Sequence, residues 1–221
     1  MAYNFSTPRV ITDGLVLYLD AANTKSYPGS GTTWRDMSGN NITGSLTNGP
    51  TFNSANGGSI VFDGTNDSVI MADNSTLNTQ TPSVEVWIKT NATNQNGFWF
   101  EKGTVNTQYS LFQEGTNIVW RQDVRSQYTN TATYITTTDW AQVIGTYTSG
   151  DRRTYINGIL RTSDAQTGVV ATNAGGMFIG TYGGGGYPYN GSVAVVRVYN
   201  RVLSPVEILQ NYNAQKSRFN L

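Results

Sequence analysis

Carboxylates are the side chains of this chain that could do acid–base or nucleophilic chemistry, because its 221 residues include no histidine and no cysteine. Without those two types there is no Ser-His-Asp triad, no thiolate nucleophile and no imidazole or thiolate zinc site. A retaining glycosidase needs two carboxyl groups about 5 Å apart on one face. Glu85 is the only acid of its expected strand, and Glu101, Glu114 and Glu207 fall in other segments. The spacing of the acids predicts a protein that is not an enzyme.

One group of oxygen ligands could bind a hard cation. Asp63, Asn66 and Asp67 lie close together in the sequence, and calcium takes about six to eight oxygen ligands. They would form half of a calcium site, but no acidic residue lies between Phe178 and Asn200 to supply the other half. Asp and Asn are also common turn formers, and turn formation is the favoured interpretation. We therefore expect no cofactor, with calcium as the disfavoured alternative.

A loop at 181–190 combines flat aromatic rings with a glycine-rich backbone. Four consecutive glycines at 183–186 lose much conformational entropy when they are ordered. Tyr182, Tyr187 and Tyr189 offer amphipathic faces that could stack on sugar rings or pack on a protein, and Asn190 closes the loop. These four residues are the expected contact site for a glycan or a partner protein. The alternative is a mobile connection whose tyrosines fold back onto a sheet.

The elements that must position these residues are mostly β-strands. Residues 83–89 alternate between polar and apolar side chains, which indicates a strand with one buried face, although Trp87 adds bulk on the other. Residues 59–63 and 68–71 flank a turn-forming segment at 64–67. Their length and composition predict a β-hairpin.

Turn signals divide the rest of the chain. Residues 21–57 are rich in Gly, Pro, Asn and Asp and are expected to be mostly turns. Residues 109–113 and 118–121 should pair as a hairpin. Asn157-Gly158 is the strongest turn signal, because a type I′ turn needs a positive φ at both central residues. The second half therefore predicts a meander of antiparallel strands.

One short helix is expected near the C-terminus, at 205–213. Ser204 can act as N-cap, Pro205 suits the first helical position, and Glu207 completes a Ser-x-x-Glu capping box. Leu203 and Ile208 can form a hydrophobic staple. No strand–helix alternation that would imply a parallel sheet is present. The pattern predicts an all-β sandwich of two antiparallel sheets with one short C-terminal helix.

Composition limits the partners and the location. Only 13% of the residues are charged and the net charge is zero, so no electrostatic footprint for nucleic acid or an anionic membrane exists. The start has no basic and apolar signal-peptide pattern, and no apolar run approaches about 20 residues. We expect an N-terminal arm at 1–12, one domain at 13–213 and a C-terminal tail at 214–221, made in a cytoplasm and not crossing a membrane.

An ordered series of segments resembles the concanavalin A-like lectin/glucanase superfamily, in its laminin-G-like branch. These segments are 14–20, 34–40, 62–67, 140–147, 155–158, 178–180 and 191–208. The resemblance implies a jelly-roll sandwich and leaves the function open, because the fold hosts lectins, glycosidases and adhesion modules. The E-x-D-x-x-E pattern of related glucanases does not occur. Ala194 and Val195 stand where many ion-binding relatives have an acidic pair, which again disfavours calcium.

A narrower resemblance is to small virion surface proteins of large tailed phages, from the start of the domain near Met1, the opening at 10–16 and the tail at 216–221. It implies a non-enzymatic virion protein, assembled in the host cytoplasm, that decorates the capsid or forms part of a fibre or tail. Its partners would be capsid or tail proteins, a host-surface glycan, or copies of itself. The alternative is a free-standing carbohydrate-binding lectin module, and a glycoside hydrolase is the remote one.

Overall fold

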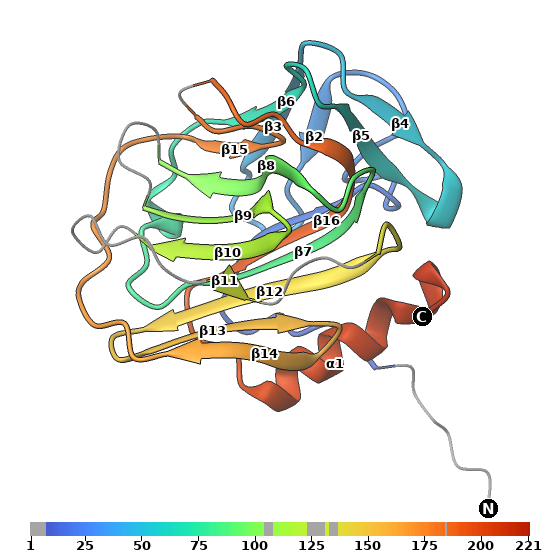
Figure 1. The fold of residues 1–221 in the computed structure, drawn as a ribbon. Coiled ribbons are helices and arrows are strands. Elements are labelled where there is room, and N and C mark those ends of the chain that lie inside the picture. Colours follow the sequence, from blue (N-terminus) through green and yellow to red (C-terminus); the bar gives the residue numbers. More distant parts are fainter. Residues whose placement is uncertain (1–7, 104–107, 123–130, 133–136, 184) are drawn as a thin grey trace, which may run out of the picture.

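The fold is a sandwich of two antiparallel eight-stranded sheets, and the computed structural model describes residues 8–103, 108–122, 131–132, 137–183 and 185–221 (Figure 1). Sheet A consists, in spatial order, of β14 (Ile159–Asp164), β13 (Asp151–Ile156), β12 (Ala141–Thr148), β7 (Ser83–Thr90), β16 (Asn190–Tyr199), β5 (Ser59–Asp63) and β4 (Thr51–Asn53), with β1 (Leu15–Asp20) also paired to β16. Sheet B consists of β11 (Thr131–Ala132), β10 (Asn117–Gln122), β9 (Tyr109–Gly115), β8 (Gln95–Lys102), β15 (Met177–Ile179), β6 (Ser68–Met71), β3 (Thr43–Thr47) and β2 (Thr33–Arg35). The predicted all-β jelly roll is confirmed.

The helices are few and short. Three 3-10 helices span η1 (Ala55–Gly57), η2 (Ser75–Leu77) and η3 (Lys216–Phe219), and the α-helix α1 spans Pro205–Gln215. The α-helix runs two residues beyond its predicted end. Ser204 and Glu207 form the predicted capping box. None of the helices among the described residues is long and apolar enough to span a membrane.

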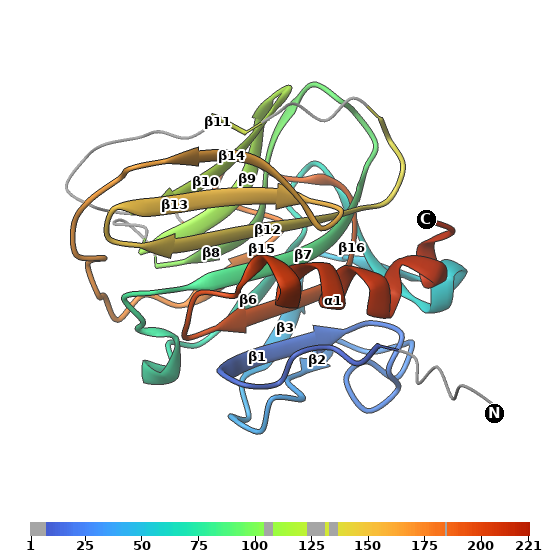
Figure 2. The ribbon, with the colours of Figure 1, turned by 90° about the horizontal axis from the view of Figure 1, so that it is seen from below.

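The main core lies between the two sheets, where alternate residues of each strand meet. In β7, Val84, Val86 and Ile88 point into this core, as the alternation predicts. The opposite face of β7 is also buried, because α1 and η3 cover the outer face of sheet A (Figure 2). There Trp87 stacks on Tyr212 of α1, with ring centroids 6.0 Å apart. The second face of this strand is therefore closed by the C-terminal elements.

The predicted hairpin at 59–71 is wrong. The strands β5 and β6 do form on either side of the expected turn, but β5 pairs with β16 and β4 in sheet A, whereas β6 pairs with β15 and β3 in sheet B. Gly64, with φ +79°, helps the chain to turn from one sheet into the other. Local composition specifies a turn, while strand pairing depends on partners far away in the sequence.

Two other expectations about turns had different outcomes. Residues 21–57 were expected to be mostly turns, yet they contain the short strands β2, β3 and β4, which gain order from pairing with longer strands of the sheets. The turn at Asn157-Gly158 is confirmed, with φ of 52° and 77°. It joins β13 to β14, whose Ile156 and Ile159 are paired. A strong local signal thus survived, while weak local preferences were overridden.

The ends of the described chain lie against the outer face of sheet A. The carbonyl oxygen of Arg9 accepts a hydrogen bond from Gln210 at 2.7 Å, and the amide of Ile11 donates to Asn211 Oδ1 at 2.8 Å. Arg218 donates to Asp20 at 2.8 Å. Figure 1 shows α1 at the opposite end of the molecule from β6 and β15. The predicted boundaries of the arm, domain and tail stay predictions, since these contacts do not test them.

Replacing Glu207 by glutamine should destabilise the fold in a pH-dependent way. Arg201 bonds both Glu207 oxygens, at 2.6 and 3.0 Å, and with the capping bonds from Ser204 this lowers the pKa of Glu207 from about 4.5 to about 2. The ionised form stabilises the fold above pH 4.5, and this contribution is lost as the pH falls towards 2. In urea unfolding, we expect Glu207→Gln to cost about 1–2 kcal/mol at pH 7. This cost should shrink below pH 4.5 and become small by about pH 2, where the folded protein begins to protonate Glu207.

The matched control for that experiment is Glu114→Gln, because Glu114 is an exposed glutamate at the end of β9. Its unfolding free energy should follow the wild-type pH profile within about 0.5 kcal/mol. Parallel profiles for the two variants would contradict the assignment of the acid dependence to Glu207.

Candidate functional site

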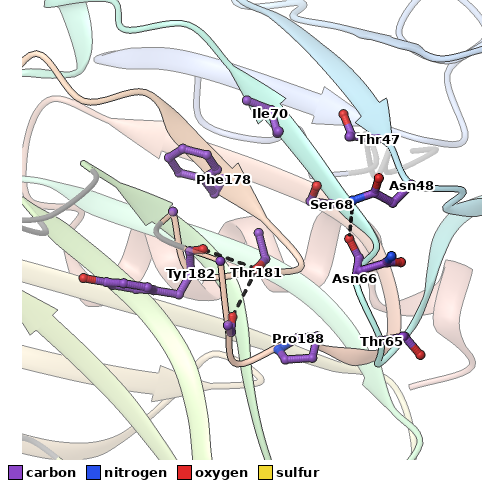
Figure 3. A pocket seen from close by; sticks show the side chains of 13 residues that line it. Thr47, Asn48, Thr65, Asn66, Ser68, Ile70, Phe178, Thr181, Tyr182 and Pro188 are labelled. Atoms are coloured by element: carbon purple, nitrogen blue, oxygen red, sulfur yellow. Dashed lines mark hydrogen bonds between the residues drawn. The ribbon is translucent and has the colours of Figure 1, made fainter.

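An open groove of about 270 Å³ lies on the outer face of sheet B (Figure 3). One wall comes from β3, β6 and the turn that links β5 to β6, and the other from the loop that follows β15. The polar side chains of its lining are hydroxyls and amides, from Thr47, Asn48, Thr65, Asn66, Ser68 and Thr181. Its larger apolar and aromatic side chains are Ile70, Phe178, Tyr182 and Pro188. None of the described residues in this lining carries a formal charge.

The alternation of side chains along β6 and β15 points Ile70 and Phe178 outward, where they form the apolar floor of the groove. Met177 and Ile179 have no exposed surface and belong to the core between the sheets, so Phe178 between them points outward. Ile70 is 39% exposed and is the register partner of Phe178 on β6. Two apolar side chains therefore lie next to each other among the polar residues of the groove.

The glycine-rich loop beside the groove is held by a series of backbone hydrogen bonds. At its base, Gly180 N donates to Phe98 O at 3.0 Å and Tyr189 N donates to Gly180 O at 2.8 Å. Towards its tip, Tyr182 N donates to Gly186 O at 3.0 Å, and Gly183 N donates to the buried Glu101 carboxylate. Such bonds offset part of the entropy lost in ordering glycines.

Close packing explains the glycine at position 183. A Cβ atom there would lie 2.5 Å from Cε2 of the Phe178 ring, which is closer than van der Waals contact permits. Glycine thus lets the loop backbone approach the aromatic floor of the groove. The sequence predicts only that the glycine run is costly to order, whereas Gly183 also has a packing role.

The four predicted contact residues of the loop have different positions. Tyr182 is half-buried and lines the groove, and its ring lies 5.4 Å from that of Phe98. Tyr187 is 56% exposed. Asn190 begins β16 and is hydrogen bonded to Asn91 and Gln95 at 2.7 and 2.9 Å, away from the groove lining. The structure brings Tyr182 to the groove and leaves Asn190 at the sheet.

Tyr189 corrects the expectation for this loop, because its side chain has no exposed surface. Its ring packs beside Phe62 and Trp99, at centroid distances of 6.2 and 6.3 Å, and burial raises its pKa. The loop re-enters the sandwich just before β16, and the pleat turns this residue inward. Tyr189 is a core residue and cannot present a face to a ligand.

The predicted calcium half-site has its carboxylates bonded to the backbone. Asp63 Oδ1 accepts from Thr65 N at 2.7 Å, and Asp67 Oδ2 accepts from Asp63 N at 3.0 Å. Burial raises the pKa of Asp67. Asn66 lines the groove and its carbonyl accepts from Asn48 Nδ2 at 3.0 Å. Within the described ranges no three His, Cys, Asp or Glu residues gather as metal ligands; calcium binding at this turn stays a prediction.

Sequence reasoning missed most of the groove. Thr47, Ile70 and Phe178 come from three separate strands, β3, β6 and β15, and Asn48 directly follows the first of them. Only the sheet brings these residues together. The outward position of Ile70 and Phe178 was available from alternation within 68–71 and 177–179. Their proximity was not, because it depends on the pairing of β6 with β15.

Solved structures with the same fold include binding domains of toxins and one domain of an arabinanase. The binding domain of Paraclostridial Mosquitocidal Protein 1 has a TM-score of 0.73 at 19% identity, and the match covers 92% of this chain and 52% of that one. The binding domain of botulinum neurotoxin DC, in complex with rat synaptotagmin II, has a TM-score of 0.74 at 17% identity, over 93% of this chain and 52% of that one. Domain 4 of AbnA, a GH43 extracellular arabinanase from Geobacillus stearothermophilus in complex with arabinotriose, has a TM-score of 0.71 at 18% identity, over 90% and 98%.

These similarities differ in how much of each neighbour they include. The chain spans about half the length of the two toxin binding domains, but nearly all of the arabinanase domain. At such identities the shared property is the fold.

No curated protein sequence matches the chain. A family model does match, over residues 63–209, which is well over half of the sequence. The chain belongs to the Concanavalin A-like lectin/glucanases superfamily.

Proposed function

We propose that this protein is a non-catalytic glycan-binding module, and that the groove on the outer face of sheet B binds a neutral oligosaccharide. The observation that carries the proposal is the chemistry of the lining. Hydroxyl and amide side chains lie beside the apolar Phe178 and Ile70, and no formal charge occurs among the described residues that line the groove (Figure 3). A sugar ring offers the complement, with an apolar face and a rim of hydroxyl groups.

The absence of charge from the lining favours neutral sugars over acidic ones. A sialic or uronic acid would bring a carboxylate into a groove whose lining residues carry no cation, and an unpaired charge costs free energy when it loses water. The acids on the adjoining turn, Asp63 and Asp67, add repulsion. Acidic glycans should therefore bind more weakly than neutral glycans of the same length.

The comparison with the arabinanase domain supports the proposal. That domain is matched over 98% of its length and its structure holds arabinotriose, so this fold alone can bind a neutral trisaccharide. The toxin neighbours include botulinum neurotoxin type C, whose cell entry is described as dependent on interaction with two ganglioside molecules. The match covers only 52% of that structure. The half that matches is not identified as the part that binds. The toxins therefore support a binding role in general and carry less weight for the glycan class.

Replacing Phe178 by alanine should weaken glycan binding about tenfold, or about 1.4 kcal/mol, because the sugar loses its stacking surface. The measurement is calorimetric titration with a panel of neutral trisaccharides, namely arabinotriose, cellotriose and maltotriose, and with the acidic trisaccharide sialyllactose. Thr47→Ala should cause a smaller loss, since it removes one hydroxyl from the groove edge.

Two variants serve as controls. Thr43→Ala lies on the same strand as Thr47 but outside the groove lining, and Ile159→Ala removes an exposed apolar side chain from sheet A. Both should bind the panel as the wild type does. A wild type that binds no glycan on a broad array would overturn the proposed function. Sialyllactose bound more tightly than the neutral sugars would overturn the assignment of a neutral ligand.

A more specific form of the proposal places this glycan-binding protein in a virion. It rests on the sequence resemblance alone, and none of the three neighbours described above is a virion protein. If the chain does decorate a capsid, fibre or tail, the groove could contact a host-surface glycan while another surface docks on a capsid or tail protein. Mass spectrometry of purified virions tests this placement directly, and absence of the protein from them would refute it.

A further inference from the structure

Tyr187 is exposed and has an unusual backbone conformation. Its φ is +48°, in the left-handed region that L-residues with bulky side chains rarely adopt. Among the described residues, the other non-glycine residues with positive φ are all asparagines: Asn41, Asn48, Asn56, Asn157 and Asn220. Asparagine tolerates this conformation because its short side chain bonds locally. A tyrosine at position 187 is therefore not explained by the backbone.

Burial does not explain the tyrosine either. The residue is 56% exposed, so less than half of its surface is removed from water. The neighbouring Tyr189, by contrast, is fully buried in the core. A strained residue persists when its surroundings hold it in place, and such residues gather at binding sites. An exposed ring held in a strained position is consistent with a contact made outside the protein.

Aromatic neighbours hold the Tyr187 ring from below. Its centroid lies 6.1 Å from that of Phe98 and 6.5 Å from that of Tyr182, the latter in an edge-to-face arrangement at 90°. Phe98 in turn stacks on Phe112, with centroids 4.3 Å apart and ring planes within 4°. The carbonyl of Tyr187 also accepts a hydrogen bond from Phe98 N at 3.3 Å. The ring thus packs against Phe98 of β8, although Tyr187 itself belongs to the loop.

The groove and Tyr187 share one wall. Tyr182, Gly186 and Pro188 line the groove, while Tyr187 lies between the last two in sequence and contacts Tyr182. The loop therefore has groove-lining residues on one side and the exposed Tyr187 ring above Phe98 on the other. A ligand that fills the groove and extends past the loop would meet that ring next.

We propose that Tyr187 forms a second, aromatic subsite of the glycan site, which takes the apolar face of one further sugar ring beyond the groove; this inference rests on the proposed function. The subsite extends the ligand across the glycine-rich loop. It contributes to the binding of a trisaccharide and little to the binding of a monosaccharide held in the groove.

The test is the variant Tyr187→Gly, measured for thermal stability and for binding to arabinotriose, cellotriose and maltotriose and to the matching monosaccharides. Glycine removes the ring and suits the positive φ. We expect the midpoint of thermal unfolding to equal or exceed that of the wild type, and the affinity for the best trisaccharide to fall roughly five- to tenfold. Monosaccharide affinity should change less than twofold.

Two further variants separate the ring from the backbone. Tyr187→Asn fits the backbone and lacks the ring, so it should lose the same affinity as Tyr187→Gly. Tyr187→Phe keeps the ring and should bind the trisaccharide within about twofold of the wild type. A Tyr187→Gly variant that binds the trisaccharide like the wild type would overturn the subsite while leaving the groove intact, and so would a lower thermal midpoint with unchanged affinity. A wild type without any glycan affinity would overturn both proposals together.

Discussion

Replacing Arg197 by methionine is expected to destabilise the fold by about 3–5 kcal/mol, because it leaves a buried carboxylate without its cation. Arg197 and Glu85 are both fully buried, and Arg197 NH1 lies 2.9 Å from Glu85 Oε1. The carboxylate also accepts hydrogen bonds from Trp87 at 3.1 Å, and from Gln142 and Asn211 at 2.9 Å each. These neutral donors would remain, but they do not balance the charge. Urea unfolding followed by tryptophan fluorescence measures the loss.

The matched control is Arg153→Met, which removes a partly exposed arginine paired with Asp151 at 2.7 Å. Exposed pairs contribute about 0–1 kcal/mol, so this variant should unfold close to the wild type. The double variant Arg197→Met with Glu85→Gln removes both charges and should recover much of the stability lost in the single variant. An Arg197→Met variant within 1 kcal/mol of the wild type would show that Glu85 finds another partner.

Replacing Phe219 by alanine should cost about 3 kcal/mol, although the residue is third from the C-terminus. Its side chain is 4% exposed and stacks on Trp87 at a centroid distance of 4.4 Å and beside Trp140 at 4.7 Å. Losing this ring leaves a gap over two indoles on the outer face of sheet A, and water entering it should shift their fluorescence to longer wavelength. Thermal or urea unfolding gives the free energy.

Leu221→Ala is the control for Phe219→Ala, since Leu221 is the last residue and is 40% exposed. It should change stability by less than about 0.5 kcal/mol. Equal effects of the two variants would mean that the tail frays in solution and that the outer face of sheet A is open.

These two predictions concern the same feature, the closure of the outer face of sheet A. Asn211 of α1 bonds to Glu85 on the sheet and to the amide of Ile11, and η3 places Phe219 over Trp87. These contacts close the part of the outer face that lies around Glu85 and Trp87. The groove proposed to bind a glycan lies on the outer face of the other sheet, sheet B.

Local signals were predicted well because they depend on neighbouring residues. The Asn157-Gly158 turn and the Ser204–Glu207 capping box need only the backbone preferences of a few adjacent residues, and the structure shows both. The hairpin at 59–71 failed for the converse reason. The turn was local, but β5 pairs with β16 and β6 with β15, strands more than a hundred residues away.

The candidate site shows the same division. Tyr182 and Tyr187 could be identified from composition as candidate contact residues. The burial of Tyr189 could not, because it depends on where the loop enters sheet A and places this ring beside Phe62 and Trp99. The floor of the groove, Ile70 and Phe178, could be predicted to point outward. Only the pairing of their strands makes them neighbours.

By itself, the sequence determined the class of fold, the absence of histidine and cysteine chemistry, the firmest turn and the helix cap. All of these follow from residue type and from spacings of a few positions, at which propensity and hydrogen bonding act directly. The tertiary structure alone decided which sheet each strand joins, which face α1 covers, and that a groove with an uncharged lining lies beside the glycine-rich loop. Long-range pairing decides these because the register of a buried strand depends on the partner that completes its hydrogen bonds and its core.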